Sequence, residues 1–192
     1  QEVTNVKSVE VPAGRFKMGS ILDGEASQPE HFVTLSQSFL ITVTEITQQE
    51  YQSLMNVNPS FNRDCPQCPV EWVSWMDALR FANAKSTEEG LEQCYVLSQQ
   101  RIAWPKGVRC SGWRLPTEAE WEFAATAMRA NEGSTQLDEG LLFYSGGNEL
   151  NDVGWYKENT KSSKPVCSKQ PNFLGVCDMT GNVSEWVWDR YG

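Results

Sequence analysis

The sequence predicts an α+β domain in which several short antiparallel strands accompany two or three helices and much irregular backbone. Clusters of β-branched and aromatic residues near the amino end are typical of strands. Later segments combine a capping residue with apolar residues at positions i, i+3, i+4 and i+7, which is typical of a helix with one buried face. The segments between them are rich in Gly, Pro, Asn and Ser, so we expect them to be loops.

Four strands are expected in the first quarter of the chain, over residues 6–11, 16–18, 32–35 and 39–43. Further on, residues 155–156 and 166–167 have the composition of short strands. Residues 183–188 alternate, with Ser184, Trp186 and Trp188 on one side, which is the pattern of a strand with two different faces.

Each of the three predicted helices begins with a hydroxyl side chain that is followed three residues later by an acid. In this arrangement each side chain can accept a hydrogen bond from the other residue's backbone N–H. The pattern predicts helices over residues 48–56, 75–85 and 118–128. In the last of them, Trp121, Ala124, Ala125 and Met128 form the face that we expect to be buried. The capping pairs are Thr47 and Glu50, Ser74 and Asp77, and Thr117 and Glu120.

Length and composition indicate one globular domain over residues 1–192, since 40% of the residues are apolar and eight are Trp. The formal net charge of -9 argues against a nucleic-acid partner, because phosphate binding needs clustered Lys and Arg. The same balance disfavours an anionic membrane surface. No stretch is long and apolar enough to predict a membrane span, and the residues after Gln1 do not resemble a signal peptide.

Six cysteines without close Cys/His clustering favour disulfides, and therefore a periplasmic, cell-surface or secreted location. Cys65 and Cys68 form a C-x-x-C pair among prolines. This spacing leaves three interpretations open: a structural disulfide, free thiols, and a redox or metal site. A structural disulfide is favoured, because the only histidine, His31, lies in a different segment and no second pair of zinc ligands is evident.

Four oxygen-bearing side chains lie within twelve residues near the carboxyl end, namely Asp178, Asn182, Glu185 and Asp189. Gly181 between them permits a sharp turn that can direct carbonyl oxygens inward. Ca²⁺ prefers such a set of oxygen ligands. From the spacing alone, a turn followed by a strand with a polar face is the simpler interpretation.

The segment GWRLPTEAEWEFAA at residues 112–125 resembles the signature helix of the formylglycine-generating enzyme family, also called sulfatase-modifying factors, which has a C-type-lectin-like fold. Four other segments resemble family motifs in the same order. They are VPAGRFKMGS at 11–20, EIT and EY within 45–51, PVEWVSWMDA at 69–78, and DMTGNVSEW at 178–186. The resemblance implies the fold over nearly the whole chain, but a fold does not specify an activity.

The resemblance also implies a calcium site near the carboxyl end. The family positions that correspond to the side chains of Asp178 and Glu185, and to the carbonyls of Gly181 and Val183, ligate calcium. Asn182-Val183-Ser184 matches the N-glycosylation pattern, but we expect no glycan because the pattern lies inside this turn.

A second family calcium site would lie near Asn151 and residues 158–160, including Glu158, although the connection is shorter here. Residues 170–172, Gln-Pro-Asn, resemble the sugar-reading tripeptide of C-type lectins only superficially. The resemblance implies no such role for them.

Two disulfides are expected besides the C-x-x-C pair. Cys94 and Cys110 flank a segment that resembles the variable insertion before the family's signature helix. Cys167 and Cys177 flank the Pro-Asn turn at residues 171–172, which could bring two strands together.

Two functions remain open at this point. The first is an extracytoplasmic, calcium-stabilised module that binds an unidentified protein or small ligand, or has a structural role, without catalysis. The second is an oxidase that converts a sulfatase cysteine to formylglycine with copper and O₂. The catalytic members carry their copper-binding cysteines beyond the stretch that corresponds to residues 188–192. We therefore expect a C-terminally incomplete domain, or one completed by a separate chain. The iron-dependent branch of the fold is excluded, because it needs a cluster of histidines.

Overall fold

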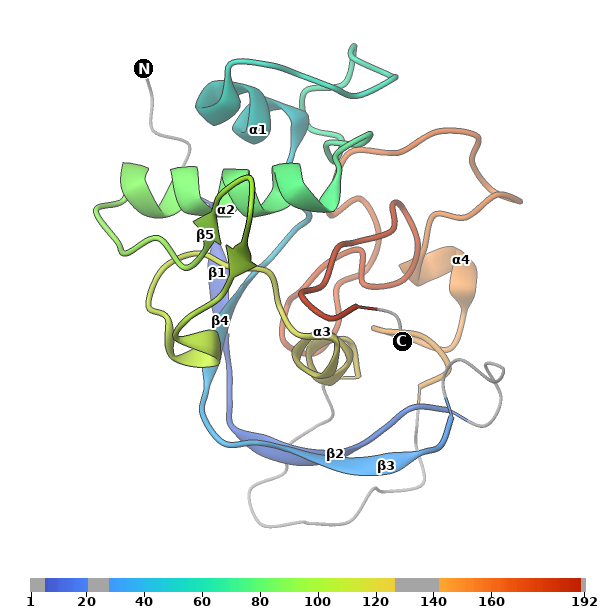
Figure 1. The fold of residues 1–192 in the computed structure, drawn as a ribbon. Coiled ribbons are helices and arrows are strands. Elements are labelled where there is room, and N and C mark those ends of the chain that lie inside the picture. Colours follow the sequence, from blue (N-terminus) through green and yellow to red (C-terminus); the bar gives the residue numbers. More distant parts are fainter. Residues whose placement is uncertain (1–5, 21–27, 127–141, 191–192) are drawn as a thin grey trace.

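The structure is a computed structural model of the 192-residue chain, and it describes residues 6–20, 28–126 and 142–190. Its amino-terminal part is a bent antiparallel ribbon in which β1 pairs with β4 and β2 pairs with β3 (Figure 1). These strands confirm the four predicted ones to within two residues at each end. They are β1 (Ser8–Val11), β2 (Gly14–Met18), β3 (His31–Leu35) and β4 (Phe39–Thr42).

Helix α3 (Glu118–Ala125) lies in the angle of this ribbon (Figure 1). Gly14 lies where the ribbon bends, and a Cβ atom at this position would be 2.8 Å from the ring of Phe123. Phe16 packs against the same ring, with 5.1 Å between the centroids. The absence of a side chain at Gly14 therefore lets the signature helix approach the ribbon closely.

Helices α1 (Gln48–Met55) and α2 (Trp75–Glu88) pack on each other beyond the far end of the ribbon. Tyr51 and Phe81 stack between them with 5.3 Å between ring centroids. All three predicted capping pairs form reciprocal hydrogen bonds. Helix α2 is three residues longer than predicted, α3 ends at Ala125, and Met128 lies outside the described residues.

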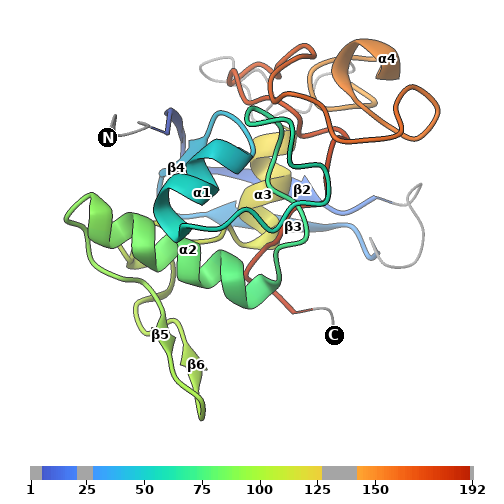
Figure 2. The same ribbon diagram turned by 90° about the horizontal axis from the view of Figure 1, so that it is seen from above.

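Between α2 and α3 the chain forms a small hairpin of β5 (Val96–Leu97) and β6 (Ile102–Ala103), and a single 3₁₀ turn, η2 (Gly107–Arg109). Figure 2 shows the hairpin projecting away from the rest of the molecule. A short helix, α4 (Leu150–Val153), follows α3 in the sequence. The sequence predicted none of these elements.

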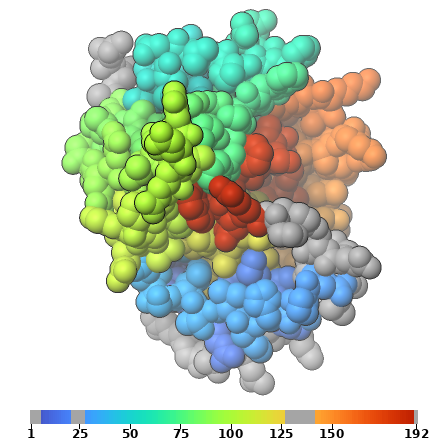
Figure 3. Space-filling model, in the orientation of Figure 1, coloured from blue at the N-terminus to red at the C-terminus, as the bar shows by residue number. Residues whose placement is uncertain are grey.

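Two buried clusters form the core. The first cluster contains Leu79 and Ala82, on the buried face of α2, together with Tyr95. The second contains Val11, Ala124 and Val176 and lies between the ribbon and α3. Trp188 inserts into the first cluster, stacking on Tyr95 with 5.3 Å between ring centroids and tilting against Trp75 and Trp104. Figure 3 shows residues that precede the carboxyl end lying in the surface between α2 and the β2–β3 pair.

Three predicted strands are wrong. Trp155 forms one isolated bridge, to Gly181, and no strand includes residues 166–167, where Cys167 has a positive φ of 56°. Residues 183–188 form no ladder either. Their contacts are to loops and side chains instead, such as the hydrogen bond of 2.8 Å from the Trp188 N–H to the Pro116 carbonyl.

Three disulfides are present, and they use all six cysteines: Cys65–Cys68, Cys94–Cys110 and Cys167–Cys177. The predicted pairs Cys94–Cys110 and Cys167–Cys177 are confirmed, and the C-x-x-C pair is a disulfide. This number of bridges indicates an oxidising environment. Among the helices that the structure describes, none has the length and apolar character needed to cross a membrane.

Candidate binding cavity and cation site

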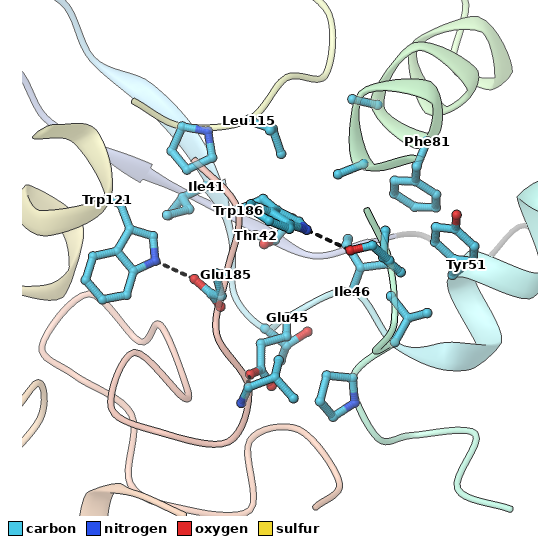
Figure 4. A pocket seen from close by; sticks show the side chains of 18 of the residues that line it. Ile41, Thr42, Glu45, Ile46, Tyr51, Phe81, Leu115, Trp121, Glu185 and Trp186 are labelled. Atoms are coloured by element: carbon cyan, nitrogen blue, oxygen red, sulfur yellow. Dashed lines mark hydrogen bonds between the residues drawn. The ribbon is translucent and has the colours of Figure 1, made fainter. Parts of the chain in front are cut away.

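A cavity of about 220 Å³ lies among α2, the entrance to α3, the connection from β4 to α1, and the segment at residues 183–186 (Figure 4). Its walls are mostly apolar, and they include Ile41, Ile46, Phe81, Leu115 and Met179. Pockets of this kind, apolar with a few polar groups, are the usual form of ligand sites in proteins. The polar groups in this cavity include the carboxyl groups of Glu45 and Glu185.

Glu45 lies three residues after the end of β4 and is only 8% exposed. The side-chain amide of Asn182 donates to its Oε2 at 2.7 Å, and the backbone N–H of Val183 donates to its Oε1 at 3.2 Å. Burial raises the pKa of Glu45 to about 9, and the nearby negative charges of Glu185 and Asp178 act in the same direction. Glu45 therefore holds its proton at neutral pH.

Glu185 also faces the cavity, where its carboxylate accepts a hydrogen bond from the indole N–H of Trp121 (Figure 4). The next side chain, Trp186, also lines the cavity, and its indole N–H donates to the Val73 carbonyl at 2.8 Å. Although the residue as a whole is exposed, the carboxyl group of Glu185 is shielded from water at the cavity wall. This desolvation raises the pKa of Glu185, and the charge of Asp178 raises it further. The signature helix thus reaches the carboxyl-terminal segment through a hydrogen bond between side chains that are 64 residues apart.

Asp178 is buried and has a positive φ of 59°. Its Oδ2 accepts a hydrogen bond of 2.6 Å from the N–H of Cys167. Burial raises the pKa of Asp178. The charge of Asp178 thus disfavours the charged forms of Glu45 and Glu185, and the charge of Glu185 adds to the effect on Glu45. No ion pair within the described residues involves any of the three.

The turn between Asp178 and Glu185 is held tightly against Trp155. Gly181 has a φ of 91°, and a Cβ atom there would be 2.2 Å from the Trp155 carbonyl oxygen, so no other residue fits without a shift of the backbone. The N–H of Asn182 donates to that same oxygen at 2.8 Å. Within the described residues, the carbonyl oxygens of Gly181 and Val183 accept no hydrogen bond.

The structure thus presents the four predicted calcium ligands as two carboxylates and two carbonyls on one turn. Glu185 bonds to Trp121 and Asp178 bonds to Cys167, so the two carboxylates have separate partners. The described residues include no cluster of three or more His, Cys, Asp or Glu side chains close enough to hold a metal ion. Carboxylate and carbonyl oxygens are nevertheless a suitable donor set for Ca²⁺.

A family model described as "Sulfatase-modifying factor enzyme 1-like domain" matches residues 1–192. The chain belongs to the sulfatase-modifying factor family. It is 32% identical to a "Chaperone protein LppX" of Paenibacillus barcinonensis, over 89% of this chain and 69% of that protein. It is 24% identical to the formylglycine-generating enzyme of Mycobacterium tuberculosis, over 95% of this chain and 74% of the enzyme.

Solved structures agree with this assignment. Treponema denticola variable protein 1 superposes with a TM-score of 0.80 at 32% identity, over 98% of this chain and 75% of that one. The chain also matches a serine/threonine-protein kinase, pkn1, of Chlamydia pneumoniae, but it spans only 27% of that protein's length. The family therefore includes relatives whose names describe quite different roles.

At the second family calcium position the oxygens of Asn151 already have protein donors. Its Oδ1 accepts a hydrogen bond from the hydroxyl of Tyr156 at 2.8 Å, and its backbone carbonyl accepts one from the ammonium group of Lys169. The side chain of Glu158 pairs with Lys157 at 3.5 Å on the surface. A calcium site at Asn151 and Glu158 stays a prediction.

The remaining motif residues make contacts within the protein. Asn172 is buried, and its amide donates to the Ala124 carbonyl at 2.8 Å. The amide of Asn182, to which a glycan would be attached, is bonded to Glu45. His31 lies on the exposed face of β3, with its Nδ1 2.9 Å from the Pro29 carbonyl.

Sequence reasoning missed Glu45 and Trp121 as site residues. Glu45 was noted only as part of a family motif, and Trp121 only as part of a buried helix face. The one available signal was an acid placed between an apolar strand and the cap of α1. Nothing in the spacing shows that Glu45 and Val183, which lie 138 positions apart, come into contact.

Proposed function

We propose that residues 1–192 form an extracytoplasmic, calcium-stabilised module that binds a ligand or a partner protein, or has a structural role, and that these residues alone do not catalyse a reaction. The observation that carries this proposal is an apolar cavity in a protein whose six cysteines are all in disulfides. Copper-dependent oxidation of a cysteine needs soft thiolate ligands to hold Cu(I). A cavity that lacks them but has apolar walls is suited to binding.

The walls of the cavity suggest the kind of group that it receives. A volume of about 220 Å³ holds a bulky apolar side chain or a small apolar ligand. Glu45, which stays protonated at neutral pH, provides one polar group without a charge. The names of two relatives, a chaperone and a variable protein, favour a partner protein as the source of that side chain.

Calcium has a physical role in this proposal. Asp178 and Glu185 lie in one another's field and near Glu45, and burial makes the charge on Asp178 and on Glu45 more costly. A divalent cation held by the two carboxylates, together with the carbonyls of Gly181 and Val183, would remove that repulsion. It would also fix the segment that leads from Gly181 to Trp188 and forms one wall of the cavity.

A second candidate function is the formylglycine-generating oxidase. It is favoured by the similarity to the Mycobacterium tuberculosis enzyme, which extends over 95% of this chain. In that case copper would have to be held by thiolates other than the six cysteines at residues 65–177.

Oxygen consumption separates the two functions. The chain and the Mycobacterium tuberculosis enzyme are each loaded with copper and given a Cys-x-Pro-x-Arg peptide, with a Ser-x-Pro-x-Arg peptide as the matched control. We expect the enzyme to consume O₂ only with the cysteine peptide, and this chain to consume none above the control. Copper-dependent consumption by this chain, with formation of a peptide aldehyde, would establish the oxidase instead.

A further inference from the structure

Two large aromatic side chains stand in solvent on the connection between α1 and α2. Phe61 is 84% exposed and Trp72 is 78% exposed, and their rings lie side by side with 6.5 Å between centroids and 25° between planes. Paired aromatic rings left in water are unfavourable, and on soluble proteins such patches mark binding sites. We refer to this pair as the aromatic platform.

The backbone beneath the aromatic platform is firmly held. Ser60 is fully buried and its hydroxyl accepts a hydrogen bond from the N–H of Glu71 at 3.1 Å. The Glu71 carboxylate in turn accepts one from the N–H of Asn62 at 3.3 Å. The buried amide of Gln48, in α1, donates to the Asn62 carbonyl at 2.8 Å. These bonds join the two parts of the chain that carry the rings, so the platform is preorganised.

The backbone of Trp72 adopts a φ of 60°, in the left-handed region that bulky side chains avoid. Such a conformation persists only where the surrounding structure imposes it, and it is concentrated at functional sites. In Trp72 the left-handed conformation occurs in a residue whose ring is exposed to solvent and is not packed in the core. Core packing therefore does not account for the position of the Trp72 side chain.

The rings border a hollow of about 460 Å³ whose remaining lining is polar apart from Pro59. Arg63 and Asp64 bring opposite charges to it, and no ion pair in the described part of the chain uses either one. The side-chain amide of Asn62 adds both a donor and an acceptor. The hollow thus combines apolar ring faces, hydrogen-bonding groups of both kinds and no net charge.

We propose that the aromatic platform binds a neutral carbohydrate. A pyranose ring has an apolar face of C–H groups that packs on an aromatic ring, and a rim of hydroxyls that both donate and accept. Asn62, Arg63 and Asp64 match that rim. A strongly charged ligand fits less well, because a cation would meet the like charge of Arg63 and an anion that of Asp64. The proposal does not depend on the function proposed above, since the residues that line this hollow and the cavity do not overlap.

Saturation-transfer NMR with a panel of neutral oligosaccharides, made of β-linked glucose, α-linked glucose or N-acetylglucosamine, tests this proposal. The proteins compared are the wild-type chain, Trp72→Ala, Phe61→Ala and the control Phe143→Ala. Phe143 is 80% exposed but does not line the hollow. We expect at least one sugar to bind the wild type and the control within twofold of each other, and to bind Trp72→Ala and Phe61→Ala at least tenfold more weakly. Melting temperatures of the variants check that each is folded.

Several results would overturn the proposal. One is the absence of binding by any sugar of the panel at 10 mM. Another is a bound sugar whose affinity is the same for Trp72→Ala and the wild type. A third is capture of a peptide from a peptide-display library that requires Trp72 when no sugar binds, which would make the platform a protein-binding site.

Discussion

At the scale of single residues, Glu45 gives the fold a pH dependence that an ordinary surface acid does not. Its pKa is about 9 in the folded chain and close to the usual 4.5 in the unfolded one. Between these values the folded state keeps a proton that the unfolded state has lost. The contribution of Glu45 to the free energy of unfolding is therefore largest below pH 4.5. It falls as the pH rises toward 9, by up to about 1.4 kcal/mol per pH unit.

Urea unfolding in EGTA from pH 5 to pH 8 measures this effect. We expect Glu45→Gln to reduce the loss of unfolding free energy over that range, because glutamine does not titrate. Glu10→Gln, which changes an exposed acid of β1, should follow the wild type. A Glu45→Gln profile parallel to that of the wild type would show that Glu45 titrates normally in the folded chain.

Trp72 provides a second test at this scale, because its left-handed backbone is strained for any residue with a Cβ atom. The conformation costs roughly 1–2 kcal/mol, and glycine avoids that cost. Since the side chain is exposed, removing it loses little burial. We expect Trp72→Gly to be more stable than Trp72→Ala by about 1 kcal/mol in chemical denaturation. Equal stability of the two variants would mean that the backbone relaxes to a negative φ.

At the scale of elements, the signature helix α3 depends on a buried ion pair at its start. Arg114 and Glu120 form two hydrogen bonds of 2.7 and 2.8 Å and both side chains are largely buried. Glu120 also accepts from the N–H of Thr117 at 2.9 Å, which completes the cap. Glu120→Ala would leave the Arg114 guanidinium buried without its partner.

We expect Glu120→Ala to lower the free energy of unfolding by about 3–5 kcal/mol, as removal of one partner of a buried pair commonly does. Glu118→Ala, on the exposed side of the same turn, should cost less than about 1 kcal/mol. Urea titrations of the two variants make the comparison. Losses of similar size would indicate that helix charge, and not the buried pair, stabilises α3.

The helices could be predicted from sequence because their starting signals are local. Thr47, Ser74 and Thr117 each lie three residues from the acid that completes the cap. The prediction of a strand at residues 183–188 was wrong, because alternation alone cannot supply the partner strand that a ladder needs. Alternation gives the segment two faces, but Trp186 and Trp188 are positioned by Val73 and Tyr95, which lie far away in the sequence.

At the scale of the whole molecule, the order of the motifs was enough to predict the family and the fold. The predicted disulfides at Cys94–Cys110 and Cys167–Cys177 are also present. The cavity could not be predicted, because its walls come from β4, α1, α2, α3 and the carboxyl-terminal segment together. Its acids, Glu45 and Glu185, interact only after the segment that follows β4 contacts the carboxyl-terminal segment.

We propose that calcium stabilises the folded chain through the turn at residues 178–185. A cation that binds only the folded state adds about 2.7 kcal/mol at a hundredfold excess over its dissociation constant, which corresponds to several degrees in the melting temperature. The effect should be specific to Ca²⁺, because Mg²⁺ requires a smaller and more regular set of ligands.

The most direct measurement is thermal melting of the chelator-treated chain with added Ca²⁺, added Mg²⁺ or EGTA, for wild type, Glu185→Gln and the control Glu10→Gln. We expect Ca²⁺ to raise the midpoint of the wild type and of Glu10→Gln by several degrees, and that of Glu185→Gln by much less. A wild-type midpoint that does not respond to Ca²⁺, or a full response in Glu185→Gln, would contradict the account.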